Sequence, residues 1–208
     1  MRTLGLIAAW MVMGAAVPAH ASLIALEDFE GTVTGWSNNS VSDPGGNGGG
    51  FTKHLGRYGQ GDSVFKTFAL SGSQTAVNIK FDFYRLDSWD NELFIAIAND
   101  RRRNSATFAQ PGNFNDGGPT NIYNPTWTDR IYSASFLLNT SASSFTLTFS
   151  SGLDQDFTDE SWGVDNLRIT DNISGNPGAI PEPATWAMMI LGFGAAGSMI
   201  RRRKAVVA

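Results

Sequence analysis

Apolar and polar residues alternate with a period of two along much of the chain. In SSFTLTFS, residues 143–150, the apolar residues Phe145, Leu147 and Phe149 alternate with Ser and Thr. The segment AVNIKFDFYRL, residues 76–86, shows the same alternation. A period of two sends successive side chains to opposite faces of a β-strand. Both segments are therefore expected to be strands with one buried face.

Further strands are expected where short apolar runs are bounded by turn residues. These runs are SVFKTFAL (63–70), LFIAIA (93–98), RIYSASFLLN (130–139) and VDNLRIT (164–170). Gly, Pro and Asn dominate residues 40–50 and 109–127, which predicts loops there. Short strands with glycine-rich connections, and no amphipathic helix, predict an all-β domain. We expect a single antiparallel β-sandwich of the jelly-roll type over residues 22–170, followed by a linker at 171–180.

The beginning of the sequence has the composition of a signal peptide. One cation, Arg2, precedes an apolar run from Leu4 to Val17, and Ala19-His20-Ala21 has the small-x-small pattern of a cleavage site. We expect signal peptidase to cut there and to remove residues 1–21. The mature chain would then begin at Ser22, outside the inner membrane.

A second apolar stretch lies close to the end of the sequence. Residues 184–200 contain no charged side chain, and as a helix they would span about 26 Å at ~1.5 Å per residue. This length is at the short end of what crosses a bilayer. The basic residues 201–204 follow, and the excess of positive charge in cytoplasmic segments places them inside the cell. We therefore expect a C-terminal transmembrane helix with a cytoplasmic tail.

The residues around this stretch resemble a bacterial targeting signal. A Pro-Glu-Pro tripeptide precedes Trp-Ala, spaced glycines and a cluster of arginines, so that residues 181–204 resemble the PEP-CTERM sorting domain in its PEPxxWA variant. The sorting residues would be Pro181, Glu182, Pro183, Trp186, Arg201, Arg202 and Arg203. The resemblance implies that an exosortase recognises the chain as a substrate and cuts near the tripeptide. It also implies a bacterium that makes extracellular polysaccharide, and a mature protein at the cell surface or outside the cell.

Charge and cysteine content restrict the functions open to the exported part. Between residues 22 and 180 there are 10 Lys or Arg and 18 Asp or Glu, which leaves a net charge of −8. Such a domain repels phosphate backbones, which argues against nucleic acid as a partner. The chain has no Cys, which excludes disulfides, thiol nucleophiles and cysteine-ligated zinc.

Two short segments resemble carbohydrate-binding proteins. The opening EDFEGTVTGW, residues 27–36, and the late strand WGVDNLRIT, residues 162–170, are similar to jelly rolls of the galactose-binding-like, carbohydrate-binding type. The resemblance implies that the first and last strands are neighbours and that a structural calcium ion lies beside them.

Asp165 is the candidate metal ligand. If the late strand alternates regularly, Asp165 shares a face with Leu167 and Ile169 and points into the core. A buried carboxylate needs hydrogen bonds or a cation, and calcium prefers oxygen ligands. We expect one calcium ion bound by Asp165, together with Glu30 or Asp28 and backbone carbonyls. A carboxylate that is paired with arginine or bonded to backbone groups is the alternative.

Acidic residues crowd two predicted loops, at residues 85–92 and 153–163. Each segment resembles half a calcium site, with alternate oxygens along a loop, although neither matches an EF-hand. Most of these acids are expected to be solvated, but two carboxylates on separate loops are also what a glycoside hydrolase requires. The alternative function is therefore a secreted polysaccharide hydrolase on the jelly-roll scaffold. His54 is the one histidine outside the signal peptide, and no G-x-S-x-G motif accompanies it. We expect His54 to be an ordinary surface or turn residue.

Aromatic and amide side chains in the loop at 109–127 are the candidate ligand contacts. The indole of Trp127 would stack on a sugar ring, while Asn121 and Asn124 would bond to sugar hydroxyls. Together with the sorting signal, these residues predict a non-enzymatic glycan-binding or structural module associated with an extracellular polysaccharide or biofilm.

Overall fold

A computed structural model of the chain describes residues 21–45, 49–118 and 122–172. They belong to one compact unit, Ala21–Ser174. The predicted signal peptide and the predicted sorting residues lie outside the described residues. Within the described part of the chain, no helix is long and apolar enough to cross a membrane.

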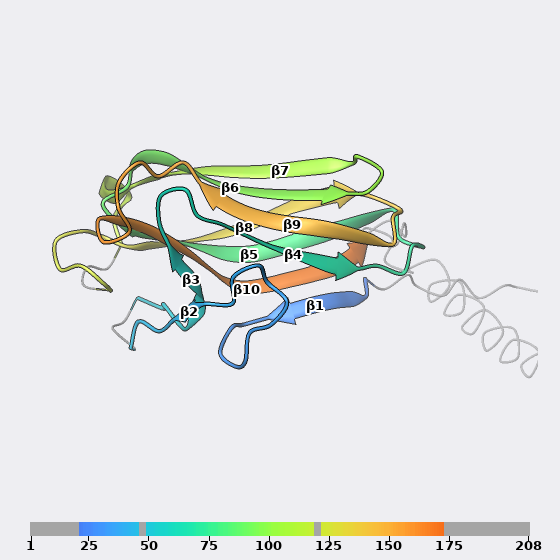
Figure 1. The fold of residues 1–208 in the computed structure, drawn as a ribbon, viewed down its shortest axis with the longest axis horizontal. Helices are drawn as coiled ribbons and strands as arrows, with labels where there is room; N and C mark the ends of the chain where they lie inside the picture. The colour runs from blue at the N-terminus through green and yellow to red at the C-terminus, as the bar shows by residue number, and fades with distance from the viewer. Residues whose placement is uncertain (1–20, 46–48, 119–121, 173–208) are drawn as a thin grey trace, which may run out of the picture. The chain divides into compact units, whose positions relative to one another are not determined.

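Ten strands lie in the described part of the chain and form two antiparallel sheets (Figure 1). The strands are β1 (Leu23–Glu27), β2 (Val41–Ser42), β3 (His54–Tyr58), β4 (Ser63–Ala69), β5 (Ala76–Asp87), β6 (Asp90–Asp100), β7 (Ser105–Asn113), β8 (Arg130–Asn139), β9 (Ser144–Ser151) and β10 (Glu160–Asn172). A short 3-10 helix, η1 (Phe114–Asp116), follows β7.

The strand order confirms the predicted jelly-roll sandwich. Sheet A has the order β2-β3-β10-β5-β8, with β1 also paired to β10, and sheet B has the order β4-β9-β6-β7. From β3 onward the chain crosses repeatedly between the sheets, which gives two interlocked four-stranded layers, β3-β10-β5-β8 and β4-β9-β6-β7. Leu26 of β1 lies opposite Arg168 of β10. The first and last strands are therefore neighbours, as the resemblance implied.

The core fills the space between the two sheets with aromatic side chains. Phe83 of β5 stacks on Phe94 of β6 with ring centroids 4.1 Å apart and an interplanar angle of 13°. Trp162 of β10 meets Phe94 edge to face at 5.5 Å. All three side chains are fully buried. Each such ring pair adds about 0.5–1.5 kcal/mol to the stability that burial contributes. Because the alternation in β5 and β6 directs these rings inward, it determines how the sheets pack.

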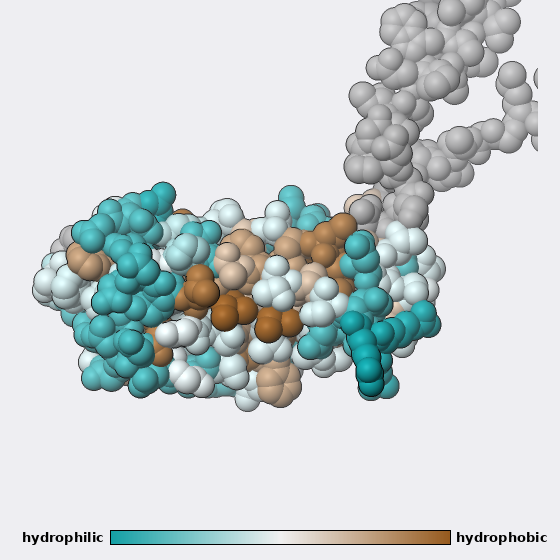
Figure 2. Space-filling view, turned by 90° about the horizontal axis from the view of Figure 1, so that it is seen from above, coloured by the Kyte–Doolittle hydropathy of each residue, from teal (hydrophilic) through white to brown (hydrophobic). Residues whose placement is uncertain are grey.

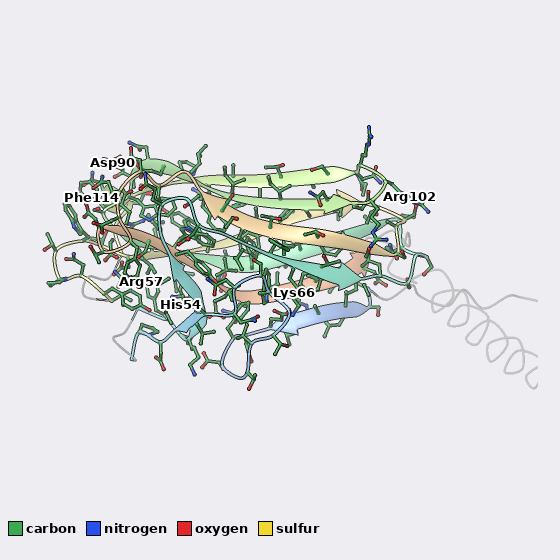
Figure 3. The ribbon with its side chains drawn as sticks, in the orientation of Figure 1. His54, Arg57, Lys66, Asp90, Arg102 and Phe114 are labelled. Atoms are coloured by element: carbon green, nitrogen blue, oxygen red, sulfur yellow. The ribbon has the colours of Figure 1, made fainter. Side chains whose placement is uncertain are left out.

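The surface on the β7 side is apolar in the middle and hydrophilic toward its ends. Figure 2 shows apolar side chains along the centre of this face, a broad group of hydrophilic side chains at its left end and further hydrophilic side chains at its right end. The loops that carry Asp90 and Phe114 lie at the left end (Figure 3). We call this end, which holds the β5–β6 turn and the start of β10, the loop end.

One strand extends into a segment that the sequence predicts to be a loop. The predicted loop begins at residue 109, but β7 continues to Asn113 and includes Pro111 and Gly112. Proline cannot donate to a ladder, and it is tolerated on edge strands. Because β7 is the edge strand of sheet B, the loop starts several residues later than its composition indicates.

A β-bulge interrupts β10 where it runs beside β5. Asp165 lies opposite Asp82, but Arg168 lies opposite Lys80, so β10 holds one extra residue between these two pairs. Asn166 accommodates the bulge with a φ of 51°, which lies in the left-handed region that Asn enters more readily than most residues.

The bulge changes the face on which Asp165 lies. Val164 before the bulge and Leu167 after it both belong to the core between the sheets. Asp165 bonds instead to Tyr84, which belongs to a second buried cluster, with Phe51, on the outer face of sheet A. The prediction that Asp165 faces the core was wrong, because the bulge breaks the regular alternation that it assumed.

Candidate functional site

Asp165 is buried on the outer face of sheet A, and both of its carboxylate oxygens accept hydrogen bonds. Its Oδ2 accepts hydrogen bonds from the hydroxyls of Thr52 at 2.6 Å and Tyr84 at 2.7 Å. Its Oδ1 accepts the backbone N–H of Asn166 at 2.6 Å. Only 1% of the residue is exposed, so these donors offset most of the cost of burying the charge. This arrangement supports the hydrogen-bonded alternative that the sequence leaves open.

The two other predicted calcium ligands lie in the loop after β1. Asp28 accepts the backbone N–H of Glu30 at 3.3 Å, and Glu30 accepts the backbone N–H of Lys53 at 3.1 Å. Lys53 follows Thr52, which bonds Asp165, so the two acidic segments contact the same short stretch of chain. A calcium ion shared by Asp165 with Glu30 or Asp28 stays a prediction.

The predicted ligand contacts have local partners. Trp127 is half-buried and meets Phe114 at a centroid distance of 5.0 Å and an angle of 66°. Asn124 accepts the backbone N–H of Thr126 at 2.9 Å, which stabilises a turn. Asn121 lies outside the described residues. Sugar contact by these three residues stays a prediction.

His54 is a buried residue of β3, and the expectation of a surface or turn residue was wrong. The side chain is fully buried, and its Nδ1 lies 2.9 Å from the carbonyl oxygen of Thr52. Burial lowers the pKa of His54, which keeps the ring neutral near pH 7. Gly163 makes room for the ring, since a Cβ there would lie 2.2 Å from the His54 Cδ2.

The acids of the two predicted acidic loops have separate roles. Asp87 forms an ion pair with Arg57 at 2.9 Å, and Asp159 accepts the hydroxyl of Ser88 at 2.8 Å. Three others, Asp90, Glu92 and Glu160, gather at the loop end. Burial, and after it the charge of Glu92, raises the pKa of Glu160 to about 7.

The sequence gives no signal for Asp129, which is buried at the same end. Its carboxylate accepts the backbone N–H groups of Asp87 at 2.8 Å and Ile122 at 3.3 Å. Nearby, the buried guanidinium of Arg85 donates to the carbonyl of Thr128 at 2.7 Å. Burial, opposed by the Asp87 N–H bond, raises the pKa of Asp129 to about 6. These contacts join loops far apart in sequence, so no local pattern reveals them.

Asp129 is expected to make stability depend on pH. Its folded pKa of about 6 lies above the unfolded value of about 3.9, so the folded state holds the proton longer and stability falls as pH rises through this window. The free energy of unfolding of the wild type, relative to that of Asp129→Asn, should fall by about 2 kcal/mol from about pH 4 to about pH 7. Urea unfolding at several pH values measures this difference. A difference that does not change with pH would contradict the raised pKa.

Away from the loop end, where Asp90 is exposed, the outward face of sheet B carries no charged side chain in the described strands. In each strand the outward residues alternate with inward residues that are less exposed. The outward residues are Ser63, Phe65, Thr67, Ala69, Leu93, Ile95, Ile97, Asn99, Ser105, Thr107, Ala109, Pro111, Ser144, Thr146, Thr148 and Ser150. Strand register places Phe65 beside Thr148, Thr148 beside Ile97, and Ile97 beside Thr107. We call this the neutral face.

Comparison with solved structures finds several proteins of low sequence identity. Latent PorU from Porphyromonas gingivalis is 12% identical, with 78% of this chain covered, 14% of that chain covered and a TM-score of 0.45. A carbohydrate-binding module of lichenase 5A from Cellvibrio mixtus, solved with cellotriose, is 18% identical over 72% of this chain and 98% of that one (TM-score 0.42). TmCBM61, solved with β-1,4-galactotriose, is 9% identical over 74% of this chain and 100% of that one (TM-score 0.46).

Comparison with curated proteins found no match to this sequence. Among protein families, the PEP-CTERM protein-sorting motif matches residues 179–204. This range contains the tripeptide at 181–183 and the arginines at 201–203 from which the resemblance was inferred. The chain therefore carries a PEP-CTERM protein-sorting motif, which implies export, a C-terminal membrane anchor before processing, and processing by an exosortase.

Proposed function

We propose that this chain is an exported bacterial surface protein whose β-sandwich binds an uncharged polysaccharide without cleaving it. The sorting motif supports the location. The neutral face is the observation that carries the binding function, because it is free of charge in a domain whose net charge is −8. Covering a charged group removes its hydration at a cost, so a face without charges is the part of this surface that a neutral polymer covers most readily.

The side chains of the neutral face have the chemistry that a sugar polymer requires. Thr146, Thr148 and Ser150 present hydroxyls, each of which donates and accepts hydrogen bonds. Phe65 is 50% exposed and offers a flat apolar ring beside them. Four neighbouring strands make the face about 14 Å wide, which is enough for several sugar units in a row.

Binding through such a face is expected to be weak for each copy. A dissociation constant near the millimolar range corresponds to about −4 kcal/mol. Many copies on one cell surface, facing a repetitive polymer, would raise the overall avidity well above the affinity of one site. A protein that is displayed in many copies can therefore hold a matrix without one tight site.

The alternative function, polysaccharide hydrolysis, would use the acids of the loop end. Asp90, Glu92 and Glu160 do lie together there, and a raised pKa suits a general acid. However, Glu160 is 0% exposed, and a general acid has to reach the glycosidic oxygen. The burial of Glu160 supports the non-catalytic proposal.

Co-sedimentation of the purified protein with insoluble neutral polysaccharides tests the proposal. Phe65→Ala should reduce the bound fraction at least about 10-fold, because it removes the exposed ring of the neutral face. Trp127→Ala tests the loop predicted from the sequence, and Leu137→Ala is the matched control, because Leu137 is 44% exposed on β8 of sheet A. All variants should retain the parent's circular dichroism.

The outcomes separate the possible functions. Loss of binding in Phe65→Ala alone places the ligand on the neutral face. Loss in Trp127→Ala alone would place it on the loop and contradict the neutral face. A parent protein that never binds would favour a purely structural role, and release of soluble sugars from the polymer would favour the hydrolase.

A further inference from the structure

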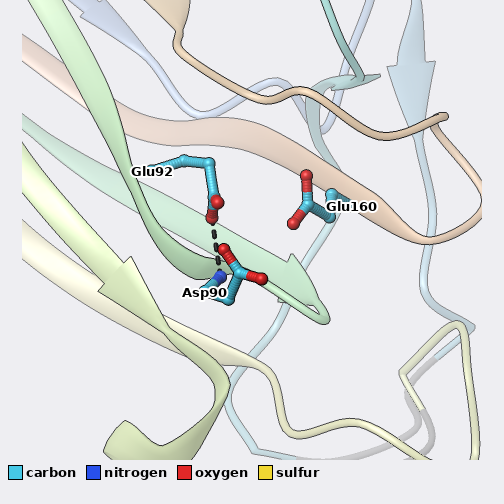
Figure 4. A group of neighbouring side chains, drawn as sticks. All are labelled: Asp90, Glu92 and Glu160. Carbon is cyan, nitrogen blue, oxygen red and sulfur yellow. Dashed lines mark hydrogen bonds between the residues drawn. The ribbon is translucent and has the colours of Figure 1, made fainter.

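Three carboxylates converge at the loop end, and none of them forms an ion pair with another described residue. Asp90 and Glu92 belong to β6, and Glu160 is the first residue of β10. One oxygen from each lies within 4.8 Å of the other two. Figure 4 shows the Glu160 carboxylate directed toward Asp90 and Glu92. Glu92 also accepts the backbone N–H of Asp90 at 2.6 Å, which holds its side chain over the turn.

Glu160 provides an independent sign that something is bound here. The residue is 0% exposed, and its Oε2 is buried without a hydrogen-bond partner. Its Oε1 accepts a long bond of 3.4 Å from the Nε2 of Gln155. A buried carboxylate oxygen without a donor is costly, and the charge of Glu92 beside it adds repulsion. The Glu160 carboxylate is directed at two further carboxylates, and a cation bound among the three would relieve this cost.

The nearby cationic side chains are bound elsewhere. Arg57 pairs with Asp87, and Arg85 donates to the backbone carbonyls of Asp87 and Thr128. The two ion pairs found among the described residues do not include any of the three acids. The charge of the cluster is therefore not neutralised by the described part of the chain.

We propose that a calcium ion binds between Asp90, Glu92 and Glu160 and connects sheet B to sheet A at the loop end. Carboxylate oxygens are the ligands that calcium prefers, at about 2.3–2.6 Å. Two oxygens bound to one calcium ion are therefore at most about 5 Å apart, a limit within which separations up to 4.8 Å fall. Asp90 is exposed, so water can complete the coordination from that side.

The ion would hold the two sheets together, at a site different from the one predicted from the sequence. β6 lies in sheet B and β10 in sheet A, so an ion held by both joins the two layers near the turn. The predicted ligand Asp165 lies further along β10, and its carboxylate already accepts hydrogen bonds from Thr52 and Tyr84. The two sites share no residue, so variants distinguish them.

Terbium luminescence and calorimetry of the purified full chain test the site. Trp89 is adjacent to Asp90 and fully buried, so it should sensitise a terbium ion bound in the cluster, and calcium should quench the signal by competition. Calorimetry should give one calcium ion per chain. Calcium at about 100 times the dissociation constant should raise Tm by about 5–10 °C over the protein in chelator.

Charge-removing variants assign the ion to its ligands. Asp90→Asn and Glu160→Gln should each weaken calcium binding at least about 10-fold. Asp90 is exposed, so its variant is expected to keep the fold. Asp154→Asn is the matched control, because it removes an exposed acid of the neighbouring loop that is not in the cluster. Unchanged affinity in both cluster variants, or a parent that binds neither terbium nor calcium, would overturn the proposal. Loss of binding in Glu30→Gln with full binding in Asp90→Asn would overturn it in favour of the Asp165 site.

Discussion

Replacing Pro181 and Pro183 with alanine is expected to leave the chain in the membrane instead of outside the cell. The two prolines are part of the matched sorting motif, and we predict that an exosortase reads them. Without the cut, residues 184–200 remain joined to the exported domain. Burying an uncharged stretch of this length holds a protein in the bilayer far more firmly than a surface contact does. After fractionation of the producing cells, nearly all of the variant protein should be found in the inner membrane, whereas the parent should be found in the medium or at the cell surface.

Mass spectrometry of the released parent tests the same event directly. The released form should begin at Ser22 and should lack the residues from Ala184 onward. Pro177→Ala is the matched control, because Pro177 lies in the predicted linker and outside the matched range, so it should be released like the parent. A released form that still ends at Ala208 would contradict processing at the motif.

Replacing Asp165 with alanine is expected to cost about 3–5 kcal/mol of unfolding free energy. The substitution removes the acceptor for the hydroxyls of Thr52 and Tyr84 and for the backbone N–H of Asn166. Each buried donor left without a partner costs about 1–3 kcal/mol. The lost hydrogen bonds lie at the bulge, and the extra residue depends on them to keep its conformation. Urea unfolding followed by circular dichroism measures the change.

Two control variants show whether the hydrogen bonds account for the loss. Asp82→Ala removes a neighbouring carboxylate of β5 that is only half-buried, and it should cost less than about 1 kcal/mol. Tyr84→Phe removes one donor together with its bond, and it should cost about 1–2 kcal/mol. A loss in Asp165→Ala no larger than that in Asp82→Ala would contradict the account. If the loss appears with calcium and disappears in chelator, Asp165 holds the predicted metal instead.

Local patterns were sufficient for six of the described strands (β4, β5, β6, β8, β9 and β10) and for the sorting motif. The alternation over 143–150 corresponds to β9, and the segment 76–86 corresponds to β5 with one residue added. These predictions succeeded because side-chain direction in a strand repeats every two residues, so one buried face appears directly in the sequence. The sorting motif was recognisable for a different reason: an enzyme that reads a linear segment requires its residues in a fixed order, and that order is present in the chain.

The tertiary structure decided where that alternation fails. Nothing in WGVDNLRIT marks Asn166 as a bulge, since the extra residue follows from how β10 matches both β5 and its other neighbours. One inserted residue moves Asp165 to the opposite face of the sheet. His54 was likewise expected at the surface because it lies beside glycine-rich loops. Its burial depends on residues far along the chain, such as Gly163 and Tyr84.

The same distinction holds for the candidate sites. The sequence by itself determined that acids are concentrated in the segments 85–92 and 153–163, and that the strand at 143–150 alternates apolar and hydroxyl side chains. Only the tertiary structure decided that Glu160 meets Asp90 and Glu92, and that the outward residues of β4, β6, β7 and β9 form one neutral face. The physical reason is that alternation is a property of one strand, whereas the choice of neighbouring strands depends on non-local pairing and on the packing of two sheets around one core.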